Sequence, residues 1–317
     1  MEQNRGNFGF YTGAEFLNLQ IKPREWMVQG LIREKDSVNL RGEEKSGKSL
    51  LALQLCCSLT SGEAFLNKFK VTRPYRVSYI LFEGELSDVQ DRAKRMIGEL
   101  SFEPDNFQLV YSPPLELQID GVMENLRAKL LDFKPELVIF DPVYFAFMGD
   151  LSDNAVVRRF LGNIKVFKET LGCAIMLVCH PPKDRYSQDG NRLKGGTFGS
   201  KFWDAWADHV LVLENDQKSG VRSLSCDVQR SGDITQQCAL KLLQPIPLRF
   251  EVTEAITGKE QEIIRLFTEG GHTELTTSQI ADKIGVQRPN VYPFINKIIN
   301  RLNKREDGKR VLYSLCV

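Results

Sequence analysis

Short apolar runs alternate with longer amphipathic stretches between about Asp36 and Glu214. The runs are rich in β-branched residues and predict strands, while the stretches between them place hydrophobic residues at helical spacing. This alternation is typical of a parallel sheet covered by helices, so we expect an α/β fold with a mostly parallel sheet. The expected strands are Ser37–Arg41, Arg76–Phe82, Phe107–Tyr111, Leu137–Phe140, Ala174–Val178 and His209–Leu213. The expected helices are Lys48–Ser61, Asp88–Leu100, Val122–Phe133 and Asn154–Thr170.

A second pattern begins near Thr257, after two strands that we expect to be antiparallel, Val221–Val228 and Cys238–Leu243. Helical patterns followed by a charged turn and an apolar strand predict a winged helix-turn-helix. We expect a main α/β domain at residues 1–250, with an N-terminal arm over about 1–25, and a small domain at 257–317. The small domain is expected to have helices at Glu260–Thr268, Thr277–Ile284 and Asn290–Asn303, the turn at Arg305–Arg310 and the strand at Val311–Leu315.

Composition narrows the class of protein. The formal net charge of +1 means that any affinity for nucleic acid must come from local patches. The apolar runs are too short to cross a bilayer, and the first residues lack the basic start and apolar stretch of a signal peptide. The seven cysteines include no Cys-x-x-Cys pair. We therefore expect a cytoplasmic protein without a membrane partner, whose cysteines are reduced core thiols.

Residues 42–49 read GEEKSGKS and match the pattern G-x-x-x-x-G-K-[ST] at every fixed position, between an expected strand and an expected helix. Glycines in such a loop let backbone N–H groups point at phosphate oxygens, and the helix N-terminus adds partial positive charge. Lys48 would neutralise the β- and γ-phosphates and Ser49 would bind Mg²⁺, so we expect ATP and Mg²⁺ as cofactors. The expected ATP-binding residues are Gly42, Glu43, Glu44, Lys45, Ser46, Gly47, Lys48, Ser49 and Leu50.

Three further expected strands lead into polar residues, and the carboxyl ends of parallel strands meet at one edge of a sheet. Asp141 follows one strand and is expected to orient the metal. Glu83 follows another and is a candidate general base that activates water, with Glu85 as its competitor and a solvated surface acid as the alternative. His180 follows the third strand and is a candidate sensor of the γ-phosphate, although a lone histidine is often structural.

The order of these strand ends resembles the RecA-like P-loop ATPases, in particular the RepA-type hexameric replicative helicases of plasmids and phages. The resemblance covers roughly Trp26 to Phe250. It implies a homo-oligomeric ring, such as a hexamer, with ATP at each interface and a basic finger from the neighbouring subunit. Where the family has a Lys-x-Arg-like element this chain has Gln229 and Arg230, which leaves Arg230 as the single candidate finger, with a surface arginine as the alternative. The matching motifs are Glu25–Ile32, the P-loop, Glu83 followed by Arg92, Phe140–Pro142, His180–Lys183, Gly195–Ser200 and Trp206–Asp208.

Two other classes of P-loop protein fit less well. A GTPase needs Asn-Lys-x-Asp after a core strand, and the nearest approach, Asn303–Glu306, lacks the aspartate and lies near the C-terminus. A small-molecule kinase needs an arginine-rich lid, and the loop from Lys183 to Lys201 has only two arginines. The kinase class stays open as the weaker alternative.

The loop from Lys183 to Lys201 also carries five basic residues against two acidic ones, together with several glycines. Contacts with phosphates need only cations and an adaptable backbone. In the RecA-like family the corresponding loop faces the central channel and contacts DNA, so the resemblance implies single-stranded DNA as a partner. A solvated surface loop is the alternative. The candidate DNA contacts are Arg185, Arg192, Lys194 and Lys201.

From Lys283 to Val317 eight basic residues stand against two acidic ones, a net charge of +6 in a chain of +1. The third expected helix offers side chains able to reach phosphates or base edges in a major groove. Pro293 would kink that helix or move its start, and protein docking is the alternative role for the domain. The candidate DNA contacts are Arg288, Asn290, Tyr292 and Lys297 on the helix, and Lys309 and Arg310 on the wing.

These features together predict a Mg²⁺-ATP-dependent DNA motor, in particular a ring helicase that acts in the replication of a plasmid, phage or other mobile element. A non-translocating ATPase that loads or regulates other proteins at a DNA site is the first alternative. A small-molecule phosphotransferase is the second, and it predicts ATP turnover that nucleic acid leaves unchanged.

Overall fold

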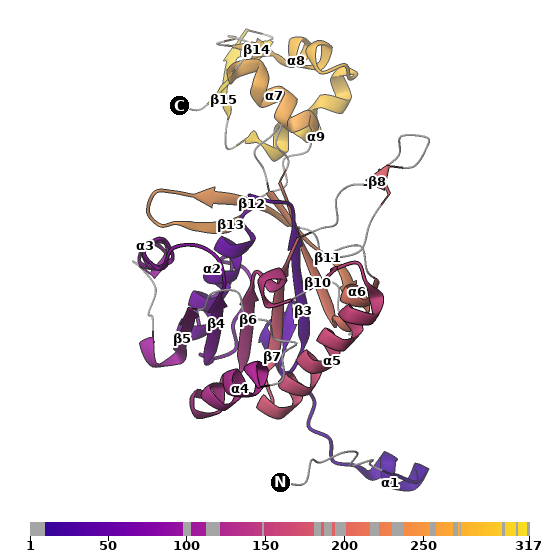
Figure 1. The fold of residues 1–317 in the computed structure, drawn as a ribbon. Coiled ribbons are helices and arrows are strands. Elements are labelled where there is room, and N and C mark those ends of the chain that lie inside the picture. Colours follow the sequence, from indigo (N-terminus) through magenta and orange to yellow (C-terminus); the bar gives the residue numbers. More distant parts are fainter. Residues whose placement is uncertain are drawn as a thin grey trace.

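The structure is a computed structural model, shown in Figure 1. It describes residues 10–97, 103–111, 121–147, 149–180, 185–186, 192–193, 201–215, 222–229, 238–253, 258–268, 272, 274–299, 302–308 and 310–315.

A large sheet forms the centre of the molecule (Figure 1). Within the described ranges its strands are β3 (Ser37–Gly42), β4 (Val77–Leu81), β5 (Phe107–Tyr111), β6 (Leu137–Asp141), β7 (Ala174–Cys179), β10 (His209–Asn215), β11 (Arg222–Gln229), β12 (Cys238–Leu243) and β13 (Arg249–Thr253). Their order across the sheet is β13-β12-β11-β10-β3-β7-β6-β4-β5. Neighbours from β10 to β5 are parallel, whereas β11, β12 and β13 continue the sheet as antiparallel strands. The predicted α/β fold with a mostly parallel sheet is therefore confirmed.

Helices cover both faces of this sheet. They are α2 (Lys48–Ser61), α3 (Leu86–Ile97), α4 (Val122–Phe133), α5 (Asn154–Leu171) and α6 (Lys201–Trp206), with 3₁₀ turns η1 (Pro104–Asn106) and η2 (Val143–Ala146). One hydrophobic cluster joins a face of the sheet to α2 and α3, and a second joins the opposite face to α4, α5 and α6.

The alternation of side chains along β4 shows how the two clusters arise. Tyr79 and Leu81 belong to the cluster under α2, and Ile80, between them, belongs to the other. Because a parallel strand covered on both faces buries every residue, it appears in the sequence as a continuous apolar run. Each large apolar side chain buried in this way contributes about 1.5–3 kcal/mol.

Several smaller elements were not predicted from the sequence. Among them are the helix α1 (Gly13–Asn18) and the short strands β1 (Trp26–Val28), β2 (Ile32–Arg33), β8 (Arg185–Tyr186) and β9 (Arg192–Leu193). Thr12 and Glu15 form a capping box at the start of α1, yet this helix buries none of its residues and lies apart from the sheet in Figure 1. Among the described helices, none is long and apolar enough to cross a membrane.

Residues beyond 257 form a further set of elements with its own hydrophobic cluster. The helices are α7 (Gly258–Thr268), α8 (Thr277–Lys283) and α9 (Arg288–Lys297), and the strands are β14 (Leu275–Thr276), β15 (Leu302–Asp307) and β16 (Arg310–Leu315). The strands form a sheet in the order β14-β16-β15. Val291 and Ile295 of α9 pack into the cluster together with Ile280 of α8.

The predicted bounds of the third helix, Asn290–Asn303, are wrong. Helix α9 begins at Arg288 and ends at Lys297, so Pro293 lies inside it and does not move its start. Residues expected to form the end of the helix and a charged turn belong instead to β15, which pairs with β16. Leu302 is the buried residue of β15 and those after it are exposed, so this strand has no apolar alternation to recognise.

The cysteines among the described residues are free, as expected, while Cys316 lies outside them. Burial raises the pKa of Cys57 and of Cys173 to about 12. Both thiols therefore stay protonated at neutral pH and act as small apolar core groups.

Candidate active site

Neighbouring parallel strands bring four chemical groups to one edge of the sheet. Strands β3, β7, β6 and β4 lie side by side in that order. The GEEKSGKS loop follows β3, His180 follows β7, Asp141 ends β6 and Glu83 follows β4. Because the strands are parallel, their carboxyl ends share an edge, which is where open α/β sheets bind ligands. Topology thus brings together groups separated by well over a hundred residues of chain.

The loop at 42–49 depends on its glycines. Gly47 has φ of 101°, in the left-handed region, and a Cβ there would lie 2.8 Å from Cζ of Phe250. A Cβ on Gly42 would lie 2.4 Å from the carbonyl oxygen of Leu213. A side chain at either position would therefore clash with its surroundings, and at Gly47 it would also be strained. The loop opens directly into α2, whose N-terminal N–H groups and dipole favour an anion.

Asp141 is 1% exposed and accepts two side-chain hydrogen bonds. The Ser49 hydroxyl donates to Oδ1 at 3.1 Å, and the Tyr79 hydroxyl donates to Oδ2. Burial raises the pKa of Asp141, while these hydrogen bonds and the charge of Lys48 oppose that rise. Sequence reasoning missed Tyr79. Its position two residues before Leu81, which pairs with Asp141, puts it on the same face of the sheet as the carboxylate.

Lys48 is 5% exposed and its Nζ donates to the carbonyl oxygen of Glu43 at 2.7 Å. Burial lowers the pKa of Lys48, and the negative charge of Asp141 is the largest of the effects that raise it again. Ser46 Oγ is buried without a hydrogen-bond partner in the described part of the chain. An orphaned hydroxyl, a lysine and a helix N-terminus around one loop fit a phosphate group.

The oxygen atoms of Ser49 and Asp141 also fit a metal ion. Mg²⁺ prefers carboxylate and hydroxyl or water oxygens and is held by few protein ligands beside substrate phosphates. The 3.1 Å contact shows that the two side chains converge on one point next to the loop. Residues of the loop could hold a nucleotide, and these two side chains could hold its metal directly or through water.

Glu83 and His180 both contact Tyr144, a residue of η2. The Tyr144 hydroxyl donates to Glu83 Oε2 at 2.8 Å, and its ring centroid lies 5.3 Å from that of His180. His180 Nδ1 is buried and has no hydrogen-bond partner among the described residues. Burial and the nearby charge of Lys48 lower the pKa of His180. A neutral imidazole close to Lys48 is suited to accept or donate a hydrogen bond without adding charge.

Residues of the antiparallel strands β11 and β13 form hydrogen bonds with the loop and with α2, the helix that follows it. Arg222 Nε donates to the carbonyl oxygen of Ser46 at 2.9 Å. The side-chain amide of Gln54, on α2, makes reciprocal hydrogen bonds of 2.7 Å with the backbone N–H and carbonyl of Phe250. These contacts involve a residue type and a register that no sequence motif specifies, so they became visible only in the structure.

Several predicted site residues fall outside what the structure describes. The backbone places Arg185 in β8, Arg192 in β9, Lys201 at the start of α6, Lys297 at the end of α9 and Arg310 at the start of β16. The structure gives no description of these side chains. Arg230, Lys194 and Lys309 lie outside the described residues altogether. The basic finger and most of the loop contacts therefore stay predictions.

The structure describes the side chains of three predicted DNA contacts on α9. Arg288, Asn290 and Tyr292 are exposed on α9, whereas Val291 and Ile295 are buried. Part of the positive charge nearby is already neutralised, because Arg305 on β15 forms an ion pair with Glu274 at 2.7 Å.

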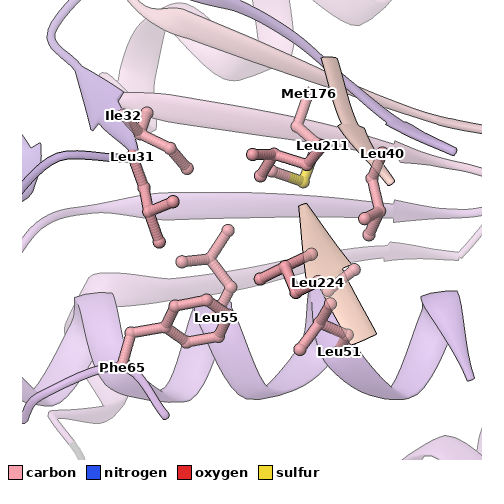
Figure 2. A pocket seen from close by; sticks show the side chains of 10 residues that line it. Leu31, Ile32, Leu40, Leu51, Leu55, Phe65, Met176, Leu211 and Leu224 are labelled. Atoms are coloured by element: carbon pink, nitrogen blue, oxygen red, sulfur yellow. The ribbon is translucent and has the colours of Figure 1, made fainter. Parts of the chain in front are cut away.

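A small cavity in the core is lined by none of the site residues. It has a volume of about 10 Å³ and is enclosed by aliphatic and aromatic side chains between α2 and the sheet, among them Leu55, Phe65 and Met176 (Figure 2). It is at most as large as one water molecule and its walls offer no polar partner. We therefore interpret it as a packing defect and not as a ligand site.

The fold, the loop and the strand-end groups define a RecA-like P-loop ATPase. A sequence profile for the family described as an AAA domain matches residues 6–186, more than half of the chain, and the protein belongs to this family. Among solved structures, a KaiC-like protein from the hyperthermophilic archaeon Pyrococcus horikoshii is similar to it, with a TM-score of 0.50 and 13% sequence identity over 72% of this chain and 93% of that one. At this identity the likeness concerns the fold. No curated protein matches the sequence.

Proposed function

We propose that the protein is a Mg²⁺-ATP-dependent DNA motor, in particular a ring-forming replicative helicase of a plasmid, phage or other mobile element. The observation that carries this proposal is the convergence of Lys48, Asp141, Glu83 and His180 on the carboxyl edge of one sheet. Family membership supports the ATPase part. The DNA part rests on the charge pattern and on the resemblance of the motifs.

In this proposal each group has its own task in hydrolysis. The loop N–H groups and Lys48 bind the β- and γ-phosphates, and Ser49 and Asp141 hold Mg²⁺, which supplies charge neutralisation when bound. Glu83 takes a proton from a water molecule as that water attacks the γ-phosphorus. Lys48 replaces its contact with the Glu43 carbonyl by contacts with phosphate, which satisfies a buried ammonium group more completely.

Coupling to DNA is proposed to pass through His180. This residue ends the described segment that follows β7, and the chain then enters the basic stretch that contains Arg185 and Arg192. His180 lies close enough to Lys48, Glu44 and Glu83 for their charges to affect its pKa. A change at the γ-phosphate can therefore reach the start of the stretch through a single side chain.

The C-terminal elements are proposed to form a winged helix that contacts duplex DNA. Helices α7 to α9 and the hairpin of β15 and β16 follow in the order that this motif requires. Arg288, Asn290 and Tyr292 are exposed on α9, and these residue types suit phosphates and base edges. Replacing Arg288 by Ala is expected to weaken duplex binding and to leave ATP hydrolysis in the absence of DNA unchanged.

Unwinding of a forked duplex tests the motor directly. The wild type should separate the strands in an ATP-dependent reaction, and Lys48→Ala should not. The same exposed residues of α9 also suit a second candidate, an ATPase that binds a DNA site and loads or regulates other proteins there. ATP hydrolysis and site binding without any unwinding would support that second function and reject the motor.

A further inference from the structure

Tyr144 contacts two of the proposed catalytic groups at once, and no motif accounts for it. It lies in η2, three residues after Asp141 in the sequence. Its hydroxyl donates a hydrogen bond of 2.8 Å to Glu83 Oε2. Its ring lies 5.3 Å from the ring of His180, with the planes inclined by 57°. One side chain therefore joins the carboxylate that follows β4 to the imidazole that follows β7.

The neighbours of Tyr144 fix its ring and keep its proton in place. The ring of Phe145 packs against it at 4.3 Å. Burial, the hydrogen bond to Glu83 and the negative charges of Glu83, Asp141 and Glu44 all raise the pKa of Tyr144. The phenol therefore remains protonated throughout the physiological range, and towards Glu83 it acts as a donor.

The same contact distinguishes Glu83 from its competitor Glu85. The backbone carbonyl of Glu85 accepts hydrogen bonds from the N–H groups of Asp88 and Val89, which places Glu85 at the start of α3. Gly84, with φ of 97°, turns the chain between the two glutamates. Of the two carboxylates, it is that of Glu83 that bonds to Tyr144 and affects the pKa of Asp141.

We propose that Tyr144 is a positioning residue for ATP hydrolysis, holding Glu83 by one carboxylate oxygen and linking it to His180. This inference rests on the proposed ATPase function and on Glu83 as its base. With Oε2 occupied by the phenol, Oε1 is the oxygen that receives the proton from water. The ring contact fixes the position of Glu83 relative to His180, the residue proposed to sense the γ-phosphate.

Replacing Tyr144 by Phe removes the hydroxyl and keeps the ring, so it isolates the hydrogen bond. We expect kcat to fall about tenfold, the order of effect of one hydrogen bond to a charged group, with KM for ATP unchanged. Tyr75→Phe is the matched control. It also removes a bonded hydroxyl, which lies 2.6 Å from Thr72 Oγ1, but near the opposite end of β4, and kcat should stay within about twofold.

A double-mutant cycle separates positioning from a general loss of structure. If Tyr144 acts through Glu83, adding Tyr144→Phe to Glu83→Gln should cause no further loss in single-turnover hydrolysis. Equal, multiplicative losses in both backgrounds would overturn the inference, and so would a normal kcat for Tyr144→Phe. If Glu83→Gln itself hydrolyses ATP at the wild-type rate, Glu83 is not the base and the inference about Tyr144 is overturned with it. A wild type that hydrolyses no ATP would instead reject the proposed function itself.

Discussion

At the scale of single residues, the site buries two oppositely charged side chains, Asp141 and Lys48. Burial pushes the pKa of Asp141 up and that of Lys48 down, which in each case favours the neutral form. Their mutual attraction and the hydroxyl groups of Ser49 and Tyr79 act in the other direction. Removing one partner of such a buried set leaves the other charge without compensation, so loss of activity in Lys48 or Asp141 variants needs a parallel check of folding.

A second buried charge pair lies at the opposite end of β3. His209 Nε2 lies 2.9 Å from Asp36 Oδ2, and the two side chains are 1% and 0% exposed. Arg24 also contacts Asp36, at 2.7 Å. The hydrogen bonds of Asp36 and Cys226 and the negative charge of Asp36 outweigh burial and raise the pKa of His209 from 6.5 to about 9.

This pair predicts a loss of stability at alkaline pH. Because the pKa of His209 is higher in the folded than in the unfolded protein, its contribution is present in full below about pH 6.5 and is lost as pH rises through about 9. Urea unfolding of the wild type and of His209→Gln measures it across this window. The difference in free energy of unfolding should shrink as pH rises, and a difference that is constant with pH would contradict the assignment.

At the scale of elements, the side chain of Gln54 on helix α2 forms two hydrogen bonds with the backbone of β13. Gln54→Ala would leave the backbone N–H and carbonyl of Phe250 without their partner inside the core. We expect the free energy of unfolding to fall by about 3 kcal/mol, since each unpaired buried group costs about 1–3 kcal/mol. Chemical denaturation measures this. Gln90→Ala on the exposed face of α3 is the control and should change stability by less than about 0.5 kcal/mol.

Gln54 also links α2, the helix that follows the nucleotide loop, to β13, the strand that precedes the C-terminal elements. If it serves only as packing, its variant should bind ATP normally once folded. We expect weaker ATP binding as well, because the ring of Phe250 lies so close to Gly47 that a Cβ on that glycine would be 2.8 Å from it. Normal affinity in a folded Gln54→Ala protein would show that β13 does not position the loop.

The elements that could be predicted from the sequence are those whose burial produces a recognisable pattern of apolar residues. Strands β6 and β7 are covered on both faces and appear as apolar runs, so their polar ends could be located. Strand β3 alternates apolar and polar residues and was located by the GEEKSGKS loop that follows it. Strand β15 has one buried residue and β13 is short and half-buried, so neither was recognised. Tyr79 and Tyr144 were missed for another reason. Their roles depend on strand register and on the order of strands, which the sequence does not state.

At the scale of the whole molecule, the N-terminal arm supports the proposed ring. Helix α1 buries no residue, and large side chains over 10–21 are exposed, with Leu17 at 82% and Phe10 at 86%. Apolar surface of this kind is stabilised when a second molecule covers it.

The arm gives a prediction about assembly. Replacing Phe16 and Leu17 by Ser should shift the protein from oligomer to monomer in size-exclusion chromatography with light scattering, because both side chains are exposed in the single chain. The fold should persist, since α1 buries none of its residues. Asn18→Ser in the same helix is the control and should keep the wild-type mass. An unchanged oligomer in the double variant would remove the arm from the proposed interface.

ATP hydrolysis with and without single-stranded DNA tests the central claim most directly. The purified wild type should hydrolyse ATP, single-stranded DNA should increase the rate several-fold, and Lys48→Ala should abolish both. Hydrolysis that DNA leaves unchanged would contradict the proposed coupling through His180 and the basic stretch that follows it. Absence of hydrolysis in the wild type under both conditions would contradict the active site as a whole.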